Sequence, residues 1–296
     1  MYEHANREIT CLNTKYNKEL TFTERKFDPF LLVKANGIYD VSNNISKSNN
    51  VVIAGATYLG SVMEARNIVL TIKDIDNYEQ NRELVDQVFQ NGVLGILTVK
   101  DGEHIRNIEY YTESIESTAT VGKRLTTISL ICPDPYFYDP NENVVNIATM
   151  TPHFEWPHEF VAEGEEFSFQ NPSRTGVIEN ETAEENTGMT MIVTVTDTVK
   201  NPQIVKIQTQ EFLRMGEDGH DFYLYRGDVL TITTHTGNKN ILLTRNGETS
   251  GANHHMTADS VFFQLSRGTN TIGYNADEGR NAIMIQVSYR NRFVRA

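Results

Sequence analysis

The sequence predicts a mainly β protein with one α-helix, in which an α+β domain is followed by a β-sandwich. Three observations predict this fold class. The first 140 residues hold several runs of alternating apolar and polar side chains and one amphipathic segment. From residue 189 onward nearly every segment has the alternating pattern, and a strongly acidic stretch separates the two parts. We therefore expect two domains, residues 1–145 and residues 146–296.

Short alternating runs define the strands of the first domain. RNIVLTIKDI at 66–75 is the clearest, and similar patterns follow at 105–117 and 124–132. Alternation with a period of two residues is typical of a strand with one buried face. SNNISKSNN at 42–50 is rich in Asn and Ser and lacks this pattern, so we expect an exposed loop there.

One helix stands out among these strands. YEQNRELVDQVFQNG has helical spacing, with Asp76 or Asn77 as the expected N-cap and Gly92 as the expected C-cap. Its predicted apolar face consists of Leu84, Val85, Val88 and Phe89. A sheet with one packed helix is an α+β arrangement.

The second domain is predicted to be almost purely β. Met189, Met191, Val193 and Val195 alternate with mostly polar side chains, and turn dipeptides such as Asn246-Gly247 recur along the segment. Strands spaced about 8–12 residues apart with Gly and Asn turns are typical of a sandwich or jelly roll. We assign residues 146–185 to an acidic connector and the entry strands of this domain.

The charge of the chain is concentrated in one place. The formal net charge is −13, and residues 155–185 alone hold nine Glu and one Arg, a net of −8. The net acidity argues against a chain-wide electrostatic grip on nucleic acid. Calcium loops need Asp-rich spacing around a Gly, whereas this stretch has irregularly spaced Glu, so we interpret it as a solvated connector.

Catalytic and metal-binding signatures are missing from the sequence. It contains no HExxH, paired CxxC, GxSxG, P-loop or GxGxxG pattern. Cys11 and Cys132 do not suffice for a disulfide framework, so we expect two buried thiols. We expect no enzyme activity, no catalytic residues, no metal and no cofactor, and no run of apolar residues reaches the length of a membrane helix.

A family resemblance emerges from the order of the motifs in the first domain. GATYLGSVMEARNIVLTI, the helix, NGVLGILTVKDGEHIRNIEYYTESIE and ISLICPDPYFYD follow one another over about 90 residues. This order resembles the N-terminal domain of phage distal tail proteins, which are found in long-tailed phages and in tail-like bacteriocins. GDVLTI, TGNKNILLTRNG, DSVFFQLSRGTNTI and SYRNRF resemble the C-terminal domain of the same family, which is galectin-like.

The resemblance implies a structural virion protein. In this family the first domain forms a homohexameric ring at the tip of a long, non-contractile tail, between the tail-tube protein and the tail-associated hub protein. A receptor-binding protein or the tape-measure protein would be further baseplate partners. DNA would pass through the lumen without specific binding, and the ring would assemble in the host cytoplasm and reside at the virion tail tip.

Several residues become interface candidates through the resemblance. Two expected strands begin with the sequence RNI, and the second of them ends in a pair of tyrosines. Three further aromatic residues follow Pro135. Each has a second interpretation: the arginines as surface charges, and the aromatics as packing under the domain edge. The candidates are Arg66, Arg106, Tyr110, Tyr111, Tyr136, Phe137 and Tyr138.

An alternative function is a carbohydrate-binding β-sandwich adhesin that recognises host cell-wall polysaccharide. Trp156 is the only tryptophan and the residue we expect to face such a ligand. It precedes the late loops of the sandwich, and Phe262 and Phe263 lie in an apolar run where at least one is expected in the core. The sequence therefore favours a scaffold over a lectin.

Overall fold

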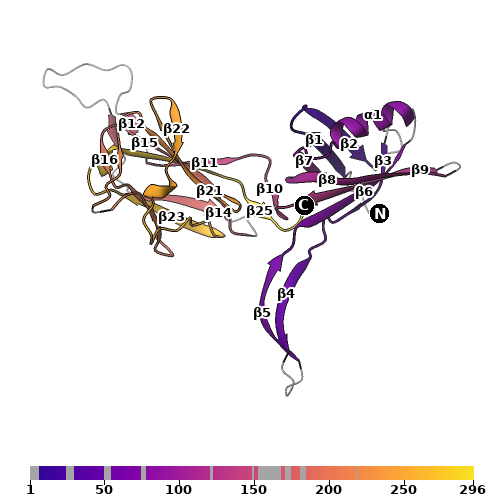
Figure 1. Cartoon of the computed structure of the whole chain (residues 1–296), viewed down its shortest axis with the longest axis horizontal. Helices are drawn as coiled ribbons and strands as arrows, with labels where there is room; N and C mark the ends of the chain where they lie inside the picture. The colour runs from indigo at the N-terminus through magenta and orange to yellow at the C-terminus, as the bar shows by residue number, and fades with distance from the viewer. Residues whose placement is uncertain are drawn as a thin grey trace. The chain divides into compact units, whose positions relative to one another are not determined.

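The protein is described by a computed structural model that divides the chain into two compact units (Figure 1). One unit contains Met1–Pro140 and Arg292–Ala296, and the other contains Asn141–Asn291. The structure describes residues 7–24, 30–49, 55–74, 78–120, 123–148, 150–152, 168–170, 175–180, 185–217 and 219–296. The division differs from the expected one at two places: the units meet after Pro140 rather than after residue 145, and the last five residues return to the first unit.

The first unit is built around one strongly curved, nine-stranded sheet. Its strand order is β25-β10-β8-β7-β1-β2-β3-β6-β9, and β8 also pairs with β9, so the sheet closes on itself. The strands are β1 (Glu8–Asn13), β2 (Lys18–Thr23), β3 (Phe30–Asn36), β6 (Arg66–Asp74), β7 (Gly95–Asp101), β8 (His104–Thr120), β9 (Lys123–Cys132), β10 (Phe137–Tyr138) and β25 (Arg292–Phe293).

Alternation along the strands fills the inside of this sheet. In β6 the side chains of Ile68, Leu70 and Ile72 are fully buried, as the pattern at 66–75 predicts. Both cysteines are free, buried thiols, and burial raises the pKa of Cys132 to about 12. The inner face therefore forms a single apolar core, to which the helix contributes.

Helix α1 (Tyr78–Val88) packs against β1 and β2 and confirms the predicted helix, with two corrections (Figure 1). Val85, Val88 and Phe89 are buried as expected, but Leu84 is exposed. Gly92 is not the C-cap, because the helix ends at Val88. The buried Asn13 donates its amide hydrogens to the carbonyls of Gln87 and Val88 instead, at 3.1 and 3.2 Å, and so satisfies the helix end. The expected N-cap lies outside the described residues.

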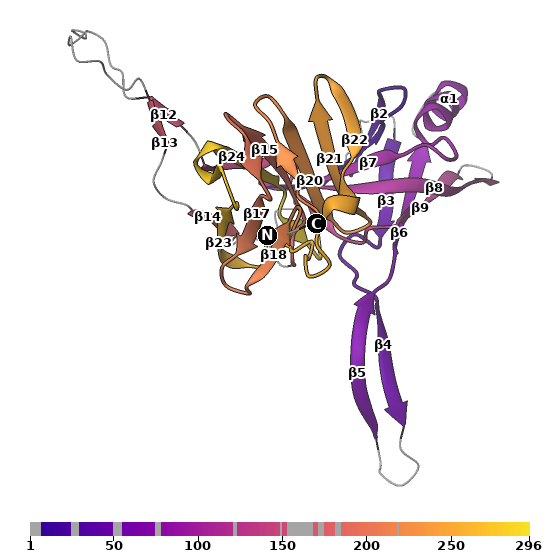
Figure 2. The same cartoon turned by 60° about the vertical axis from the view of Figure 1, so that its left-hand side comes forward.

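A hairpin of β4 (Asn43–Asn49) and β5 (Ala56–Met63) belongs to the same unit but pairs only with itself (Figures 1 and 2). The prediction of a loop at 42–50 is thus wrong in its type, since most of that segment is a strand. It is correct in its exposure, because every side chain of β4 is exposed. Cross-strand pairing rather than burial holds this segment in a strand.

The second unit is a sandwich of two antiparallel sheets. Met189, Met191, Val193 and Val195 lie in the core between them, as the sequence predicts, and so does Phe263. The sheets have the orders β11-β24-β15-β20-β21-β22 and β14-β23-β17-β18, with two-stranded pairs β12–β13 and β16–β19 beside them.

The strands of this unit are short and joined by turns. They are β11 (Asn143–Ala148), β12 (Met150–Pro152), β13 (Ser168–Gln170), β14 (Thr175–Asn180), β15 (Met189–Val195), β16 (Val199–Lys200), β17 (Gln203–Lys206), β18 (Glu211–Arg214), β19 (Tyr223–Leu224), β20 (Val229–His235), β21 (Asn238–Arg245), β22 (Glu248–Gly251), β23 (Gly268–Asn275) and β24 (Ile283–Tyr289), with 3-10 turns η1 (Asn253–His255) and η2 (Arg280–Ala282). The β21–β22 hairpin turns at Asn246-Gly247, both with positive φ, as the dipeptide predicts.

Candidate functional site

The interface candidates of the first unit converge on the end of the chain. Arg66 begins β6 and is only 7% exposed. Its guanidinium donates to four backbone carbonyls, those of Pro135 (2.8 Å), Gly37 (2.6 Å), Asp40 (2.7 Å) and Val294 (2.6 Å). Burial lowers the pKa of this guanidinium, whose charge is balanced by carbonyl dipoles rather than by a carboxylate hydrogen bond.

Two further arginines fix the last five residues of the chain, Arg106 from β8 and Arg292 from the segment itself. Arg106 donates to the carbonyl of Arg295, and its guanidinium carbon lies 3.8 Å from the centre of the Phe293 ring. Arg292 pairs with Asp134 and lies 4.1 Å from the centre of the Tyr136 ring. Cation–π contacts at such distances add to the hydrogen bonds. We call this cluster around residues 292–296 the C-terminal anchor.

The aromatic candidates divide between the core and the surface. Phe137 is fully buried and pairs with Phe293 across β10 and β25. Tyr110 is also buried and packs so closely on Gly95 that a Cβ there would lie 2.2 Å from its ring. Tyr136 and Tyr138 are half-buried, and Tyr111 is exposed on β8.

These positions correct part of the sequence interpretation. Arg66, Tyr110 and Phe137 are directed into their own subunit, so the surface of a single chain does not present them to a neighbour. The physical reason is that the CPDPYFYD segment pairs with the end of the same chain, which no local pattern reveals. Trp156 lies outside the described residues.

Sequence reasoning missed the exposed apolar side chains of the β4–β5 hairpin. Ile45, Tyr58, Leu59 and Val62 all point to solvent, and Val62 is 74% exposed. A two-stranded ribbon with apolar side chains and two unpaired edges is a surface that proteins normally cover. The TYLGSV motif could have indicated this hairpin, because its β-prone apolar residues follow a polar, Asn-rich segment that is its partner strand.

The outer face of the sheet is hydrophilic where β8, β6 and β9 meet. Glu113 accepts hydrogen bonds from Asn67 (2.8 Å) and Ser129 (2.7 Å), and Glu109 and Glu116 are exposed on the same strand. Hydroxyl side chains of Thr71, Ser114 and Thr127 occupy neighbouring positions, together with the apolar side chains of Val69 and Ile131. The face therefore combines negative charge with a hydroxyl-rich surface.

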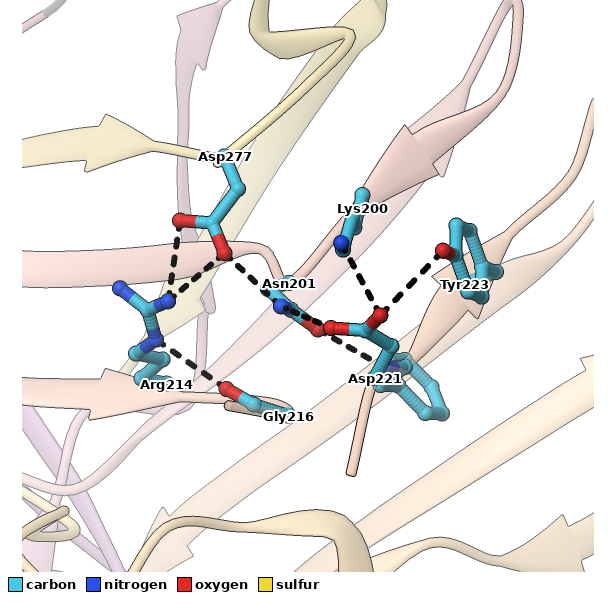
Figure 3. Close-up of polar contacts among 8 residues, drawn as sticks. Lys200, Asn201, Arg214, Gly216, Asp221, Tyr223 and Asp277 are labelled. Carbon is cyan, nitrogen blue, oxygen red and sulfur yellow. Dashed lines mark hydrogen bonds and ion pairs between the residues drawn. The ribbon is translucent and has the colours of Figure 1, made fainter. Parts of the chain in front are cut away.

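A polar network in the second unit centres on Asn201 (Figure 3). This residue is fully buried, and its amide nitrogen donates to Asp221 at 3.0 Å and to Asp277 at 2.8 Å. Arg214 forms two hydrogen bonds to Asp277, and Lys200 pairs with Asp221 at 2.9 Å. The hydrogen bond from Asn201, followed by that from Lys200, lowers the pKa of Asp221.

Nothing in the described segments has the arrangement of a metal centre. Among those residues, no group of three or more His, Cys, Asp or Glu side chains is placed to hold an ion. Across the same described segments, no helix is long and apolar enough to span a bilayer.

Comparison with known proteins identifies the second unit and the fold of the whole chain. Residues 182–293 match the model of the siphovirus-type tail component, C-terminal domain. No curated protein sequence matches the chain. The crystal structure of the Dit protein (gp 19.1) of phage SPP1, described as a paradigm of hub adsorption apparatus in phages infecting Gram-positive bacteria, aligns with a TM-score of 0.65 at 12% identity. The alignment covers 96% of this chain and 99% of that one.

A second solved structure has the same fold. A chain of the phage P2 baseplate in its activated conformation with Ca aligns with a TM-score of 0.54 at 9% identity, covering 98% of this chain and 99% of that one. Identities this low establish the fold alone. Residues 182–293 therefore match the family model of the siphovirus-type tail component, C-terminal domain, and nearly the whole chain has the fold of a phage distal tail protein, as the resemblance in the sequence predicted.

Proposed function

We propose that this protein is a structural component of the distal end of a long phage tail or of a similar bacteriocin particle. Its first unit would form a homohexameric ring, and its sandwich would serve as a docking module. The observation that carries the proposal is the family match of residues 182–293 together with the likeness of nearly the whole chain to the SPP1 Dit fold.

Ring formation needs head-to-tail contacts that close on rotation. The β4–β5 hairpin supplies exposed apolar side chains and unpaired strand edges for such a contact. The half-buried Tyr136 and Tyr138 extend the surface available to a neighbour in the first unit, whereas the exposed Tyr111 lies on the outer face of β8. Arg66, Arg106 and Phe137 act indirectly, because they hold the C-terminal anchor in place. Tyr110 instead packs against Phe89 and Gly95 in the core of the first unit.

We assign the hydrophilic outer face of β8, β6 and β9 to the lumen of the ring. Glu109, Glu113 and Glu116 would repel the phosphate backbone of DNA as it passes. An electrostatic map of the assembled ring tests this assignment, and a basic lumen would overturn it.

The proposed partners follow from the position of such a ring in a tail. One face would meet the tail-tube protein and the other the tail-associated hub protein, with a receptor-binding protein or the tape-measure protein as further partners. No step of this role uses a catalytic group, a cofactor or a membrane.

Immunogold labelling tests the location. Antibodies raised against residues 189–296 are expected to label one end of assembled tails, at the tip distal to the head. Label along the whole tail tube, at the head-proximal end, or absent from purified particles would contradict the proposal. Particles lacking a head but labelled at the tip would identify a bacteriocin rather than a phage.

A further inference from the structure

The second unit exposes a pair of tyrosines that the proposed docking role does not require. Tyr223 is 36% exposed and Tyr225 is 48% exposed, whereas Leu224 between them is fully buried. Alternate residues of an extended segment point to the same side, so both rings lie on one surface. Their ring centres are 6.3 Å apart and the rings are inclined by only 11°. The pair is therefore an ordered aromatic surface.

Fixed charges flank both rings. The ammonium group of Lys200 lies 5.9 Å from the centre of the Tyr223 ring and is held by Asp221. The guanidinium carbon of Arg245 lies 4.9 Å from the centre of the Tyr225 ring. Asp228, which is almost fully buried, accepts the hydrogen bond of Arg245 at 2.7 Å. We call these residues the tyrosine ledge.

The buried amide of Asn201 connects this ledge to a second carboxylate (Figure 3). It holds Asp221 and Asp277 at the same time, and its own oxygen accepts the backbone hydrogen of Phe222 at 2.8 Å. Gly216 lies against this oxygen, since a Cβ there would approach it to 2.2 Å. The positions of both carboxylates are thus set before any ligand arrives.

A hollow of about 480 Å³ adjoins the ledge at Asp277. The backbone of Lys200 exchanges hydrogen bonds with Asp277 and Glu278, each at 3.0 Å, so the hollow and the ledge share one wall. The polar residues lining the hollow are Asp197, Thr198, Asp277, Glu278, Arg280 and Asn281.

We propose that the tyrosine ledge and this hollow bind a neutral oligosaccharide. Sugar hydroxyls both donate and accept, which matches a surface where fixed carboxylates alternate with ammonium and guanidinium groups. The apolar face of a pyranose ring suits exposed aromatic rings. Every cation of the ledge is already paired with a carboxylate, so an anionic polymer gains no unpaired positive charge here. This binding activity goes beyond the structural role proposed above.

Titration of the full chain with defined sugars tests the proposal. The probes are the hexasaccharides of the cello, chito, xylo and laminari series, with polyglycerol phosphate as the anionic comparison, followed by ligand-observed NMR and calorimetry. At least one neutral hexasaccharide is expected to bind. Replacing each ring in Tyr223→Ala and Tyr225→Ala is expected to weaken binding by about two- to tenfold per ring.

Three controls separate the rings from general effects. Tyr223→Phe with Tyr225→Phe keeps the aromatic surface and is expected to retain binding within about twofold, because the Tyr223 hydroxyl is 3.5 Å from Asp221 and contributes little. Tyr16→Ala and Tyr58→Ala remove exposed tyrosines of the first unit and are expected to leave binding unchanged. Unchanged thermal unfolding of the alanine variants shows that the sandwich still folds.

Any of four results would overturn the proposal. These are no binding of any neutral hexasaccharide, binding that survives loss of both rings, binding of polyglycerol phosphate alone, and tyrosine-dependent capture of another tail protein without sugar binding. The last result would make the ledge a protein-docking surface. The native mass of the same variants reports ring formation separately, so failure of sugar binding leaves the structural role untouched.

Discussion

The two units of this protein differ in how completely they cover their apolar side chains and strand edges. The second unit buries the inner faces of two sheets against each other, and its polar residues are fixed by local pairs such as Arg245–Asp228. The first unit closes one curved sheet around its core, yet it leaves an apolar hairpin exposed and takes its last strand from the opposite end of the chain. This difference fits the proposed roles, assembly for the first unit and docking for the second.

The roles of arginine show the same contrast. In the first unit Arg66 is buried and holds four backbone carbonyls from segments far apart in sequence. In the second unit Arg214 and Arg245 remain partly exposed, and each pairs with a carboxylate, Asp277 and the buried Asp228 respectively. Loss of an arginine should therefore damage the fold in one unit and mainly the surface in the other.

The largest expected effect comes from Arg66→Ala. Removing the guanidinium leaves four backbone carbonyls without their donor, one of them in the C-terminal anchor, so the free energy of unfolding of the first unit should fall by about 3–5 kcal/mol. Chemical denaturation followed by the thiol reactivity of Cys11 and Cys132 measures it, because both thiols are buried in this unit. Arg82→Ala is the control, since its pair with Asp86 is exposed and should change stability by less than about 0.5 kcal/mol.

The next effect tests whether the units are energetically separate. Asn201→Ala removes the donor to Asp221 and Asp277 and the acceptor of the Phe222 backbone hydrogen, so the second unit should lose about 2–3 kcal/mol. The denaturant concentration at which Cys11 and Cys132 become reactive should not change. If the thiols become reactive at lower denaturant, the two units unfold together and the comparison fails.

A smaller effect depends on pH. Burial alone would raise the pKa of Asp228, but the hydrogen bonds from Arg245 and from the Tyr225 backbone outweigh it and hold the pKa below its ordinary value of 3.8. The lowered pKa adds stability that is fully present above pH 3.8 and is lost as the pH falls through the folded-state value. Asp228→Asn should therefore cost about 1–2 kcal/mol at pH 7, and the difference from the unsubstituted protein should shrink below pH 3.8.

Urea unfolding at a series of pH values, followed by tyrosine fluorescence, checks this dependence. A constant difference down to pH 2 would mean that Asp228 acts through its shape rather than its charge. Thr244→Ala, at a half-buried position of the neighbouring strand β21, serves as a variant without a titrating group.

The smallest effect on subunit stability is expected in the hairpin. Val62→Ser and Tyr58→Ser replace exposed apolar side chains, so the unfolding of the isolated subunit should change by less than about 0.5 kcal/mol. Assembly should nevertheless be lost, because these side chains would be covered only by a neighbouring copy. Lys47→Ser, at an exposed position of the same hairpin, controls for a general change of the surface.

The parts of the fold that could be predicted depend on local pattern. β6 and β15 alternate over seven or more residues, and the Asn246-Gly247 turn has a specific backbone requirement, so each could be recognised without knowledge of the rest of the chain. Helix α1 was recognised by its spacing. Its C-terminal end was misplaced because the capping group, Asn13, comes from a distant strand.

The parts that could not be predicted depend on contacts between distant segments. β25 is only two residues long and pairs with β10 more than 150 residues earlier in the chain. A strand this short shows no alternating pattern from which it could be predicted. The same pairing explains why Arg66 and Phe137 face inward. The tyrosine ledge was missed because Tyr223 and Tyr225 acquire their flanking cations, Lys200 and Arg245, from two other segments of the sandwich.

The native mass of the full chain tests the central claim most directly. Analytical ultracentrifugation across a hundredfold range of concentration, paired with negative-stain images, should show a hexamer with sixfold rings for the unsubstituted protein and monomers for Val62→Ser with Tyr58→Ser. A strictly monomeric protein at the highest concentration, or rings that persist unchanged in the hairpin variant, would contradict the account of the first unit as an assembly module closed by its hairpin.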